Sequence, residues 1–404
     1  MKTCLKKTTV GVLTAAALFL FTPITKPLQA HTLNPDFYEQ ITGKNIQEHI
    51  HPTSSASIKN LDEDVVPYKA SETIYSTLSE SDREEILSEF PEYGSRKIEQ
   101  TYLTLPEWYQ VYSYNEFADY LQQGGYQKDF PFMGSLKNFW SYYRIALGES
   151  KDEDFNWSYN FVTWMIGANL SVEYSVKFIY ENTVGTFTQL FTRDKTEADI
   201  FIANSWNNYA ERMYQTTWYH YPYFDDLKNI WKETPLFNKN FIRNLERKIA
   251  FSTSYLIKGT YAKAWLLLGT EKDNETFSFV YTTKRDSLEN KDMEILKEIG
   301  DNKYIIKTER YGGFKDALLQ LLEANVQFLE IQGHEVISLS YLSDNQIEPF
   351  ENSREIKMLD KRELFYNPDG YYYRVTIEAP VQNLNSVIET IELNKDKFEM
   401  IYDF

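Results

Sequence analysis

Hydrophobic and polar positions follow a helical period through the middle of the chain. Residues 155–172 carry no charge, and Glu173, Lys177 and Glu181 then follow at intervals of four. This spacing places the three side chains, with Asn169 one turn earlier, along one face of a helix. The other positions are apolar on more than one side, which is typical of a helix buried in protein or lying against lipid. We therefore expect residues 157–191 to form a central helix whose charges are paired, with Lys177, Arg212 or Lys258 as cations for Glu173.

Two further long helices are predicted after the central one. Thr196 caps the first, whose apolar face is Ile200, Ala203, Trp206, Ala210 and Met213. Asn238 caps the second, which runs to Leu268 through Phe241, Leu245, Ile249 and Leu256.

Upstream of these helices the signals are shorter. Capping residues at Ser81, Ser113 and Ser135 each predict a short helix, and Pro106 interrupts the segment between them. Residues 96–270 are therefore expected to form a helical domain with three long helices.

The period changes after residue 270. Strands are predicted at 277–283, 304–308, 328–331, 336–341, 371–378 and 398–402, with helices at 314–324 and 381–393. Residues 328–331 and 398–401 occupy matching places in two tandem βαβ units. The expected fold class is α+β, with a ferredoxin-like split βαβ domain at 277–404 that follows the helical domain. We expect residues from about 300 onward to form one antiparallel sheet with two helices on one face.

The first 30 residues have the layout of a secretory signal peptide. Lys2, Lys6 and Lys7 precede an apolar run at 10–21, and cleavage is expected after Ala30. The alternative is an uncleaved anchor at 8–24, although twelve apolar residues fall short of the roughly 20 that span a bilayer. Either form predicts an extracytoplasmic location, periplasmic or secreted, and residues 31–95 read as a polar leader with one short helix.

Composition narrows the class of protein. The 404 residues include 16% aromatics, which argues against a disordered chain, and a net charge of -17, which argues against nucleic-acid binding. The single cysteine is Cys4, so cleavage after Ala30 would leave no thiol for a disulfide or a metal. The nucleotide, P-loop, nucleophile-elbow and zinc-protease motifs are absent, and we expect neither a cofactor nor a metal.

One segment carries a resemblance to known proteins. Residues 101–113 read TYLTLPEWYQVYS, and this segment resembles a family of uncharacterised bacterial envelope proteins. The stretches 129–131, 172–174, 180–183, 231–236 and 401–404 look similar to the same family. The resemblance covers residues 98–404 and implies an exported or inner-membrane-anchored protein, with no established activity attached.

Two groups of residues are candidates for chemistry. Glu173 is a possible buried general acid, with Asn169, Lys177 and Glu181 as ligand-binding candidates on the same helix, although a structural ion-pair ladder explains this pattern more simply. Glu107 follows Pro106 in what we read as a first helical turn. It stands beside Trp108 and Tyr109, which would suit a glycan cleft if they are not in the core.

The histidines give weaker signals. His220 lies among tyrosines and is a further ligand-binding candidate, more simply a packed loop residue. His31, His49 and His51 give only a weak metal signal.

Three functions remain open on the sequence alone. The first is a non-catalytic binding or scaffold module of the envelope, which would hold an unknown envelope partner or small ligand. The second is a hydrolase acting on envelope glycan or peptide through Glu107 or Glu173. The third is a membrane-surface protein that lays residues 155–172 against lipid. The first is favoured, because the sequence supplies no set of nucleophile, base and orienting residue.

Overall fold

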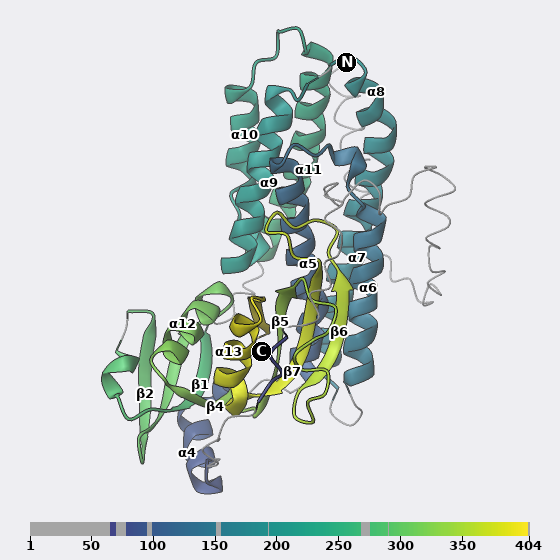
Figure 1. Ribbon diagram of the computed structural model, residues 1–404. Coiled ribbons are helices and arrows are strands. Elements are labelled where there is room, and N and C mark those ends of the chain that lie inside the picture. Colours follow the sequence, from purple (N-terminus) through teal and green to yellow (C-terminus); the bar gives the residue numbers. More distant parts are fainter. Residues whose placement is uncertain are drawn as a thin grey trace. The chain divides into compact units, whose positions relative to one another are not determined.

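The computed structural model describes residues 65–69, 78–94, 99–150, 155–192, 194–267, 275–289 and 291–402. All of them belong to one compact unit, Ile46–Phe404. Figure 1 shows helices α5 to α11 gathered in a bundle, and strands β1 to β8 in two sheets. The expected signal peptide and anchor, most of the polar leader, and His31, His49 and His51 lie outside the described residues.

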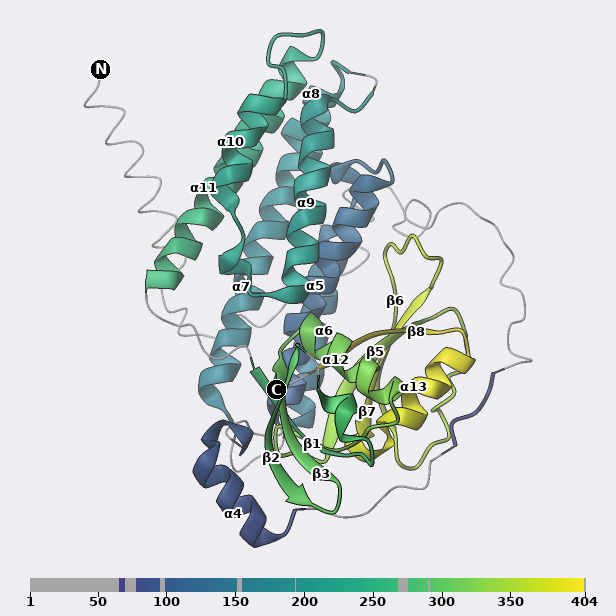
Figure 2. The same cartoon turned by 90° about the vertical axis from the view of Figure 1, so that its left-hand side faces the viewer.

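Within these residues the helical part contains five helices of 18 to 27 residues. They are α5 (Glu99–Gln122), α6 (Phe132–Glu149), α7 (Trp157–Tyr180), α9 (Glu197–Gln215) and α11 (Phe241–Leu267). A π-helical turn (Glu181–Gly185) continues α7 into the short α8 (Thr186–Gln189), and α10 (Tyr223–Glu233) precedes α11. The helices α5, α7, α9 and α11 run side by side (Figures 1 and 2). The sequence predicts three of the five long helices.

The helix α5 corrects the expectation of a break at Pro106 and a new start at Ser113. Pro106 lies inside α5, and the helix continues through Ser113 to Gln122. A proline inside a helix costs about 3 kcal/mol. The buried side chains on both sides of it, among them Leu105, Trp108 and Tyr112, outweigh that cost.

Other helix starts are set by local capping. Thr196 and Asp199 form the capping box of α9, as the sequence predicts. The short helix α4 (Glu80–Glu89) is capped by Ser79 rather than Ser81, and α6 begins at Phe132, before Ser135.

The strands form two antiparallel sheets of four strands each. The first has the order β2-β3-β1-β4, built from β1 (Glu275–Tyr281), β2 (Met293–Gly300), β3 (Lys303–Glu309) and β4 (Gln327–Ile331), with α12 (Gly312–Glu323) between β3 and β4. The second has the order β6-β7-β5-β8, built from β5 (Val336–Ser343), β6 (Lys357–Glu363), β7 (Tyr373–Pro380) and β8 (Lys397–Tyr402), with α13 (Leu384–Leu393) between β7 and β8.

The two sheets repeat one topology. In each, the third and fourth strands pair antiparallel with the first, which lies between them, and a helix makes the connection. The pairing of the first and fourth strands is interrupted by a bulge at the same place, and the extra residue is Leu329 in one sheet and Glu399 in the other. Phe328 and Phe398 precede these bulges, so the two segments matched in sequence also match in register.

The expectation of one sheet for residues 300–404 is wrong, because β5 to β8 form a sheet of their own. The sequence reading missed β2 and β6. Both are edge strands, and their sequences MEILKEIG and KMLDKRE carry several charged residues. Charges of this kind protect exposed sheet edges and weaken the hydrophobic signal of a strand.

The opposite faces of the sheets have different neighbours. One core joins the inner faces of both sheets with α12 and α13, and contains Ile306, Leu318, Leu339 and Val387. On the other face of the first sheet, Phe277 and Phe279 pack with Ile86 of α4.

The other face of the second sheet meets α5 through polar contacts. Tyr112 of α5 lies 2.8 Å from the Ser340 hydroxyl. Arg374 of β7 donates to Glu116 of α5 at 2.8 Å and to Glu399 of β8 at 2.7 Å.

Candidate functional site: charged interior and apolar exterior of the helical bundle

Glu173 lies inside the bundle and is paired across helices. Its carboxylate is 2.8 Å from the Lys258 ammonium of α11 and accepts a hydrogen bond of 3.1 Å from Tyr114 of α5. The side chains of Glu173 and Lys258 are 12% and 17% exposed, so the expected burial is confirmed. Burial acts to raise the pKa of Glu173, but the ammonium groups of Lys258 and Lys177 outweigh it, and the pKa lies below its ordinary value. The group is therefore a carboxylate at neutral pH and is poorly suited to act as a general acid.

Lys177 does not form the intrahelical pair that its spacing suggests. Its ammonium lies 4.8 Å from the ring centre of Trp206 and 5.9 Å from that of Phe117. Burial lowers the pKa of Lys177 to about 8, against the attraction of Glu173. A cation over an aromatic face is stabilised by the ring, but less than by a carboxylate.

Glu181 belongs to a second buried cluster, near the π-helical turn. Two hydrogen bonds of 2.5 and 2.7 Å join its carboxylate to the Arg247 guanidinium. Asp199 of α9 lies 3.0 Å from Arg247 and 3.1 Å from Arg243. Glu246 accepts from Tyr180 at 2.7 Å and completes the cluster. The charges inside this part of the bundle are thus matched with opposite charges, as buried ions require.

Asn169 is exposed and lies outside this polar interior, contrary to the predicted ladder. Each step of four residues turns about 40° past a full turn of an α-helix. Over the three steps from Asn169 to Glu181 the drift reaches about 120°, so the first member leaves the face that the last one occupies.

Glu107 lies inside α5 and not in a first helical turn, because α5 begins at Glu99. It accepts hydrogen bonds from Tyr159 at 2.9 Å and from Thr163 at 3.3 Å, both on α7. Thr163 and Glu173 are separated by ten residues, or about 15 Å along a helix. Paired glycosidase carboxylates lie roughly 5 to 10 Å apart, so this arrangement does not resemble such a pair.

The aromatic candidates are core residues. Trp108 is buried and its ring centre lies 5.9 Å from that of Tyr214, while Tyr109 stacks on Tyr142 at 5.1 Å. His220 is half-buried in the 3-10 turn Trp218–His220, 4.7 Å from the ring of Tyr219.

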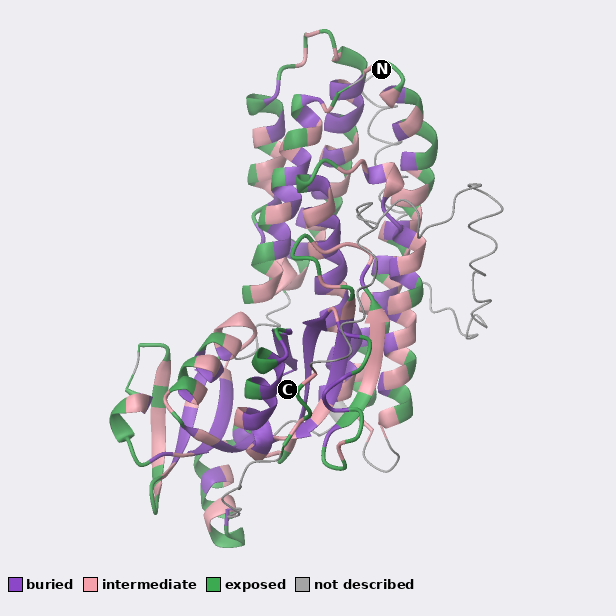
Figure 3. Cartoon of the chain, viewed as in Figure 1, coloured by how far each residue is buried: buried purple, intermediate pink, exposed green. Residues whose placement is uncertain are grey.

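The outer face of α7 and α8 is apolar. Every exposed residue between Trp157 and Phe191 is uncharged, and all three charged residues of that stretch point inward. Figure 3 shows the exposed positions along the outer side of these helices. The exposed hydrophobic side chains are Trp157, Phe161, Val162, Trp164, Val172, Val176, Ile179, Val184, Phe187, Leu190 and Phe191.

The helix α11 has the same inverted arrangement. Its charged residues Arg243, Glu246, Arg247 and Lys248 are buried and Lys258 is mostly buried, which leaves Lys263 as the exposed charge of this helix. Its outward positions include Ile242, Ile249, Leu256, Ile257 and Leu267, which are 44%, 52%, 50%, 50% and 88% exposed. We call the outward hydrophobic residues of α7, α8 and α11 the apolar flank. By contrast, the exposed residues of α9 and α10 include Asn204, Asn208, Glu211, Lys228 and Lys232.

Sequence reasoning missed most of the cations and two acids in the interior. It named Lys258 as a partner of Glu173, but not Arg243, Arg247, Asp199 or Glu246. It also counted Ile200 in the apolar face of α9 and traced α11 through the apolar residues Ile249 and Leu256, whereas all three are about half exposed. The available signal was the dense run of charges from Arg243 to Lys248, which is incompatible with Ile249 facing the same core.

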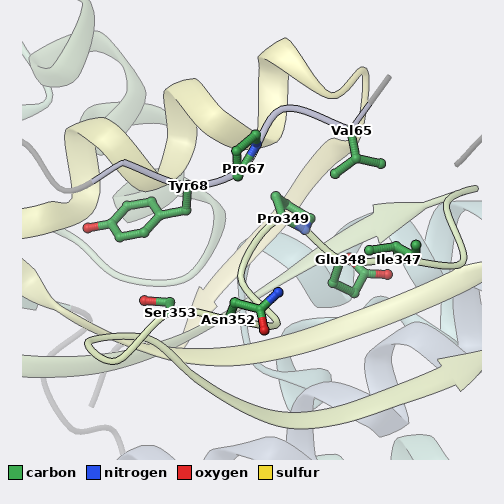
Figure 4. Close-up of a pocket in the computed structure, with 8 residues that line it drawn as sticks. All are labelled: Val65, Pro67, Tyr68, Ile347, Glu348, Pro349, Asn352 and Ser353. Atoms are coloured by element: carbon green, nitrogen blue, oxygen red, sulfur yellow. The ribbon is translucent and has the colours of Figure 1, made fainter. Parts of the chain in front are cut away.

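Two cavities in the described part of the chain lie away from the candidate carboxylates Glu107 and Glu173. Figure 4 shows one of about 280 Å³, between residues 65–68 and the loop that contains Glu348, Pro349 and Ser353. The other, of about 600 Å³, is lined by Phe191, Lys195 and Lys239 among others. Neither Glu107 nor Glu173 lines them.

Among the described residues, no group of three or more histidine, cysteine, aspartate or glutamate side chains is placed to hold a metal ion. In the same residues, none of the helices combines the length and apolarity needed to cross a membrane. Comparison of the chain with protein-family models, curated proteins and solved structures finds no match in any of the three.

Proposed function

We propose that the chain is a non-catalytic binding module of the bacterial envelope, which docks on its partner through the apolar flank. The inverted arrangement of α7 and α11 carries this proposal, since all their charged side chains except Lys263 point inward and many of their hydrophobic side chains point outward. A surface helix that faces only water has the opposite pattern. Large exposed apolar patches in proteins mark interaction sites.

The state of the candidate catalytic groups supports binding over hydrolysis. Glu173 is held by Lys258 and Tyr114, and Glu107 by Tyr159 and Thr163. Each carboxylate therefore has a structural partner, and the two carboxylates lie at different heights along the axis of the bundle.

The remaining features fit an envelope protein. The signal-like leader would deliver the chain outside the cytoplasm, and the resemblance of residues 98–404 to envelope proteins agrees with that location. We also propose that each βββαβ sheet is a variant of the ferredoxin-like split βαβ unit, and that the pair serves as a rigid support for the bundle.

Cysteine labelling tests whether the flank is covered in the cell. In a Cys4→Ser background the full chain has no cysteine. Val176→Cys and Ile249→Cys place a thiol on the flank, at positions 60% and 52% exposed. Asn208→Cys and Lys228→Cys are matched controls at exposed positions of α9 and α10.

Purified protein should react with a maleimide at all four positions, whereas in intact cells the two flank positions should be protected and the two controls should not. A membrane-permeant maleimide makes the comparison independent of the compartment. Equal labelling of all four positions in cells would mean that the flank is uncovered, and would overturn the proposed function.

A further inference from the structure

We propose that the partner of the apolar flank is the phospholipid surface of a membrane, with α7, α8 and α11 lying along it. This inference rests on the proposed function and names its partner. The bundle would bind side-on, with the flank among the acyl chains just below the headgroups.

The length of the uncharged face favours lipid. From Trp157 to Leu190 the exposed hydrophobic positions continue over 33 helical residues, or about 50 Å. Over this whole length no exposed side chain carries a charge. A protein partner tolerates charged residues at the polar rim of its interface, whereas hydrocarbon excludes them.

The inward charges match this environment. Glu173, Lys177 and Glu181 would each cost several kcal/mol if turned toward hydrocarbon. The structure instead places them against Lys258, Trp206 and Arg247 inside the bundle. The helix thus keeps its polar groups satisfied without using its outer face.

The α6 side of the flank carries positive charge, whereas α10, which packs beside α11, exposes Asp225 and Glu233 together with Lys228 and Lys232. The helix α6 packs beside α7, and Trp140 of α6 donates to Ser171 of α7 at 3.0 Å. The exposed charged side chains of α6 are Lys137 and Arg144, both basic, in a chain whose net charge is -17. Lys263 is exposed on α11. Long basic side chains at the edge of an apolar surface reach lipid phosphates while their stems stay in the apolar layer.

A second copy of the chain is the main rival occupant. Two copies would bring together two molecules that each carry a net charge of -17, and like charge opposes association. The exposed residues of the α7 and α8 face are uncharged, so this face offers no ion pair that would offset the repulsion. A lipid surface, in contrast, offers phosphate groups that Lys137 and Arg144 can bind.

Vesicle flotation of the full chain tests the proposal. Val176→Asp with Ile179→Asp places two charges on the flank, at positions 60% and 61% exposed. Asn204→Asp with Asn208→Asp adds the same charge to the outward face of α9 and serves as the matched control. All proteins retain the leader, so binding through the leader is common to them, and circular dichroism checks that each variant folds.

Wild type and control should float with phosphatidylcholine vesicles. The flank variant should bind the vesicles at least about tenfold more weakly, because it loses two aliphatic contacts and must desolvate two carboxylates. Lys137→Glu with Arg144→Glu should also weaken binding, and the loss should be larger for vesicles that contain phosphatidylglycerol than for phosphatidylcholine alone.

Equal flotation of flank variant and control would overturn the lipid assignment. So would absence of wild-type binding, together with a concentration-dependent dimer that the flank variant abolishes. Protection of Val176→Cys in cells without vesicle binding would leave the docking function standing and remove lipid as its partner.

Discussion

The interior of the bundle sets two lysines beside one glutamate. Lys258 is ion-paired with Glu173 at 2.8 Å, while Lys177 is held over the ring of Trp206. Removing one member of a mostly buried pair leaves the other charge uncompensated, which costs about 3–5 kcal/mol. Lys177 also attracts Glu173, but its ammonium lies over aromatic rings, so its removal breaks no direct ion pair and costs less.

We therefore expect Lys258→Met to destabilise the protein by about 3 kcal/mol, and Lys177→Met by less than about 1. Glu173→Ala should cost about as much as Lys258→Met, and Glu173→Gln less. Combining Glu173→Gln with Lys258→Met should cost less than the sum of the two single changes, because neither residue is then left as an unpaired charge. Urea unfolding measures all of these, and an equal loss for Lys177→Met and Lys258→Met would contradict the assignment of partners.

Asp396 gives the second sheet a pH dependence near neutrality. Burial raises the pKa of Asp396 to about 7, with Glu348 and Asp344 adding repulsion and hydrogen bonds from Ser343 and Asn345 opposing. An unfolded aspartate titrates near 3.9, so between about pH 4 and 7 the folded state binds the proton more tightly. Stability from this group is therefore present at low pH and is lost as the pH rises through 7.

Asp396→Asn mimics the protonated form and should be more stable than wild type at pH 8, with a smaller difference at pH 5. Thermal melts at the two pH values measure this. The same difference at both would show that Asp396 does not titrate in this range.

At the scale of elements, the sequence identifies a helix or strand where its periodic signal is not in conflict with another. It predicts α7, α9 and α11, and the βαβ order of each sheet. It splits α5 at Pro106 because local propensity opposes a helix there, and only tertiary burial of residues such as Trp108 decides the outcome. Periodicity also identifies the apolar face of α11 without saying whether that face packs on the bundle or points outward.

The contact between α6 and α7 depends on a glycine. A Cβ added at Gly167 would lie 2.3 Å from the Phe139 ring and 3.0 Å from Trp140. At Gly148, near the end of α6, a Cβ would meet nothing within 4 Å. We expect Gly167→Ala to cost about 1–3 kcal/mol through overpacking, and Gly148→Ala to stabilise by up to about 1 kcal/mol through helix propensity. Chemical denaturation of both variants checks this, and a stabilising Gly167→Ala would mean that α6 and α7 are less closely packed.

At the scale of the whole molecule, a buried arginine contributes to the junction between the bundle and the second sheet, beside contacts such as that of Tyr112 with Ser340. Arg374 of β7 binds Glu116 of α5 and Glu399 of β8, and its guanidinium lies 4.0 Å from the ring centre of Tyr112. Burial raises the pKa of Glu116 although Arg374 opposes it. This site was not predicted, because Glu116, Arg374 and Glu399 are distant in sequence and meet only when α5 packs on the sheet.

Arg374→Met should therefore leave two buried carboxylates without their cation and cost about 3–5 kcal/mol at pH 7. Without the cation the folded-state pKa of Glu116 rises further, so the variant should recover part of its stability as the pH falls toward 5 and Glu116 takes up a proton. Arg285→Met is the matched control. Arg285 pairs with Glu289 at the surface, where the two side chains are 53% and 56% exposed, and this change should cost less than about 1 kcal/mol.

Wild type should unfold in one transition by far- and near-ultraviolet circular dichroism. Arg374→Met should unfold in two transitions, one for the bundle and one for the sheets. A single unshifted transition in Arg374→Met would show that the apolar contacts of α5 alone join the two parts, and that the arginine is dispensable for their coupling.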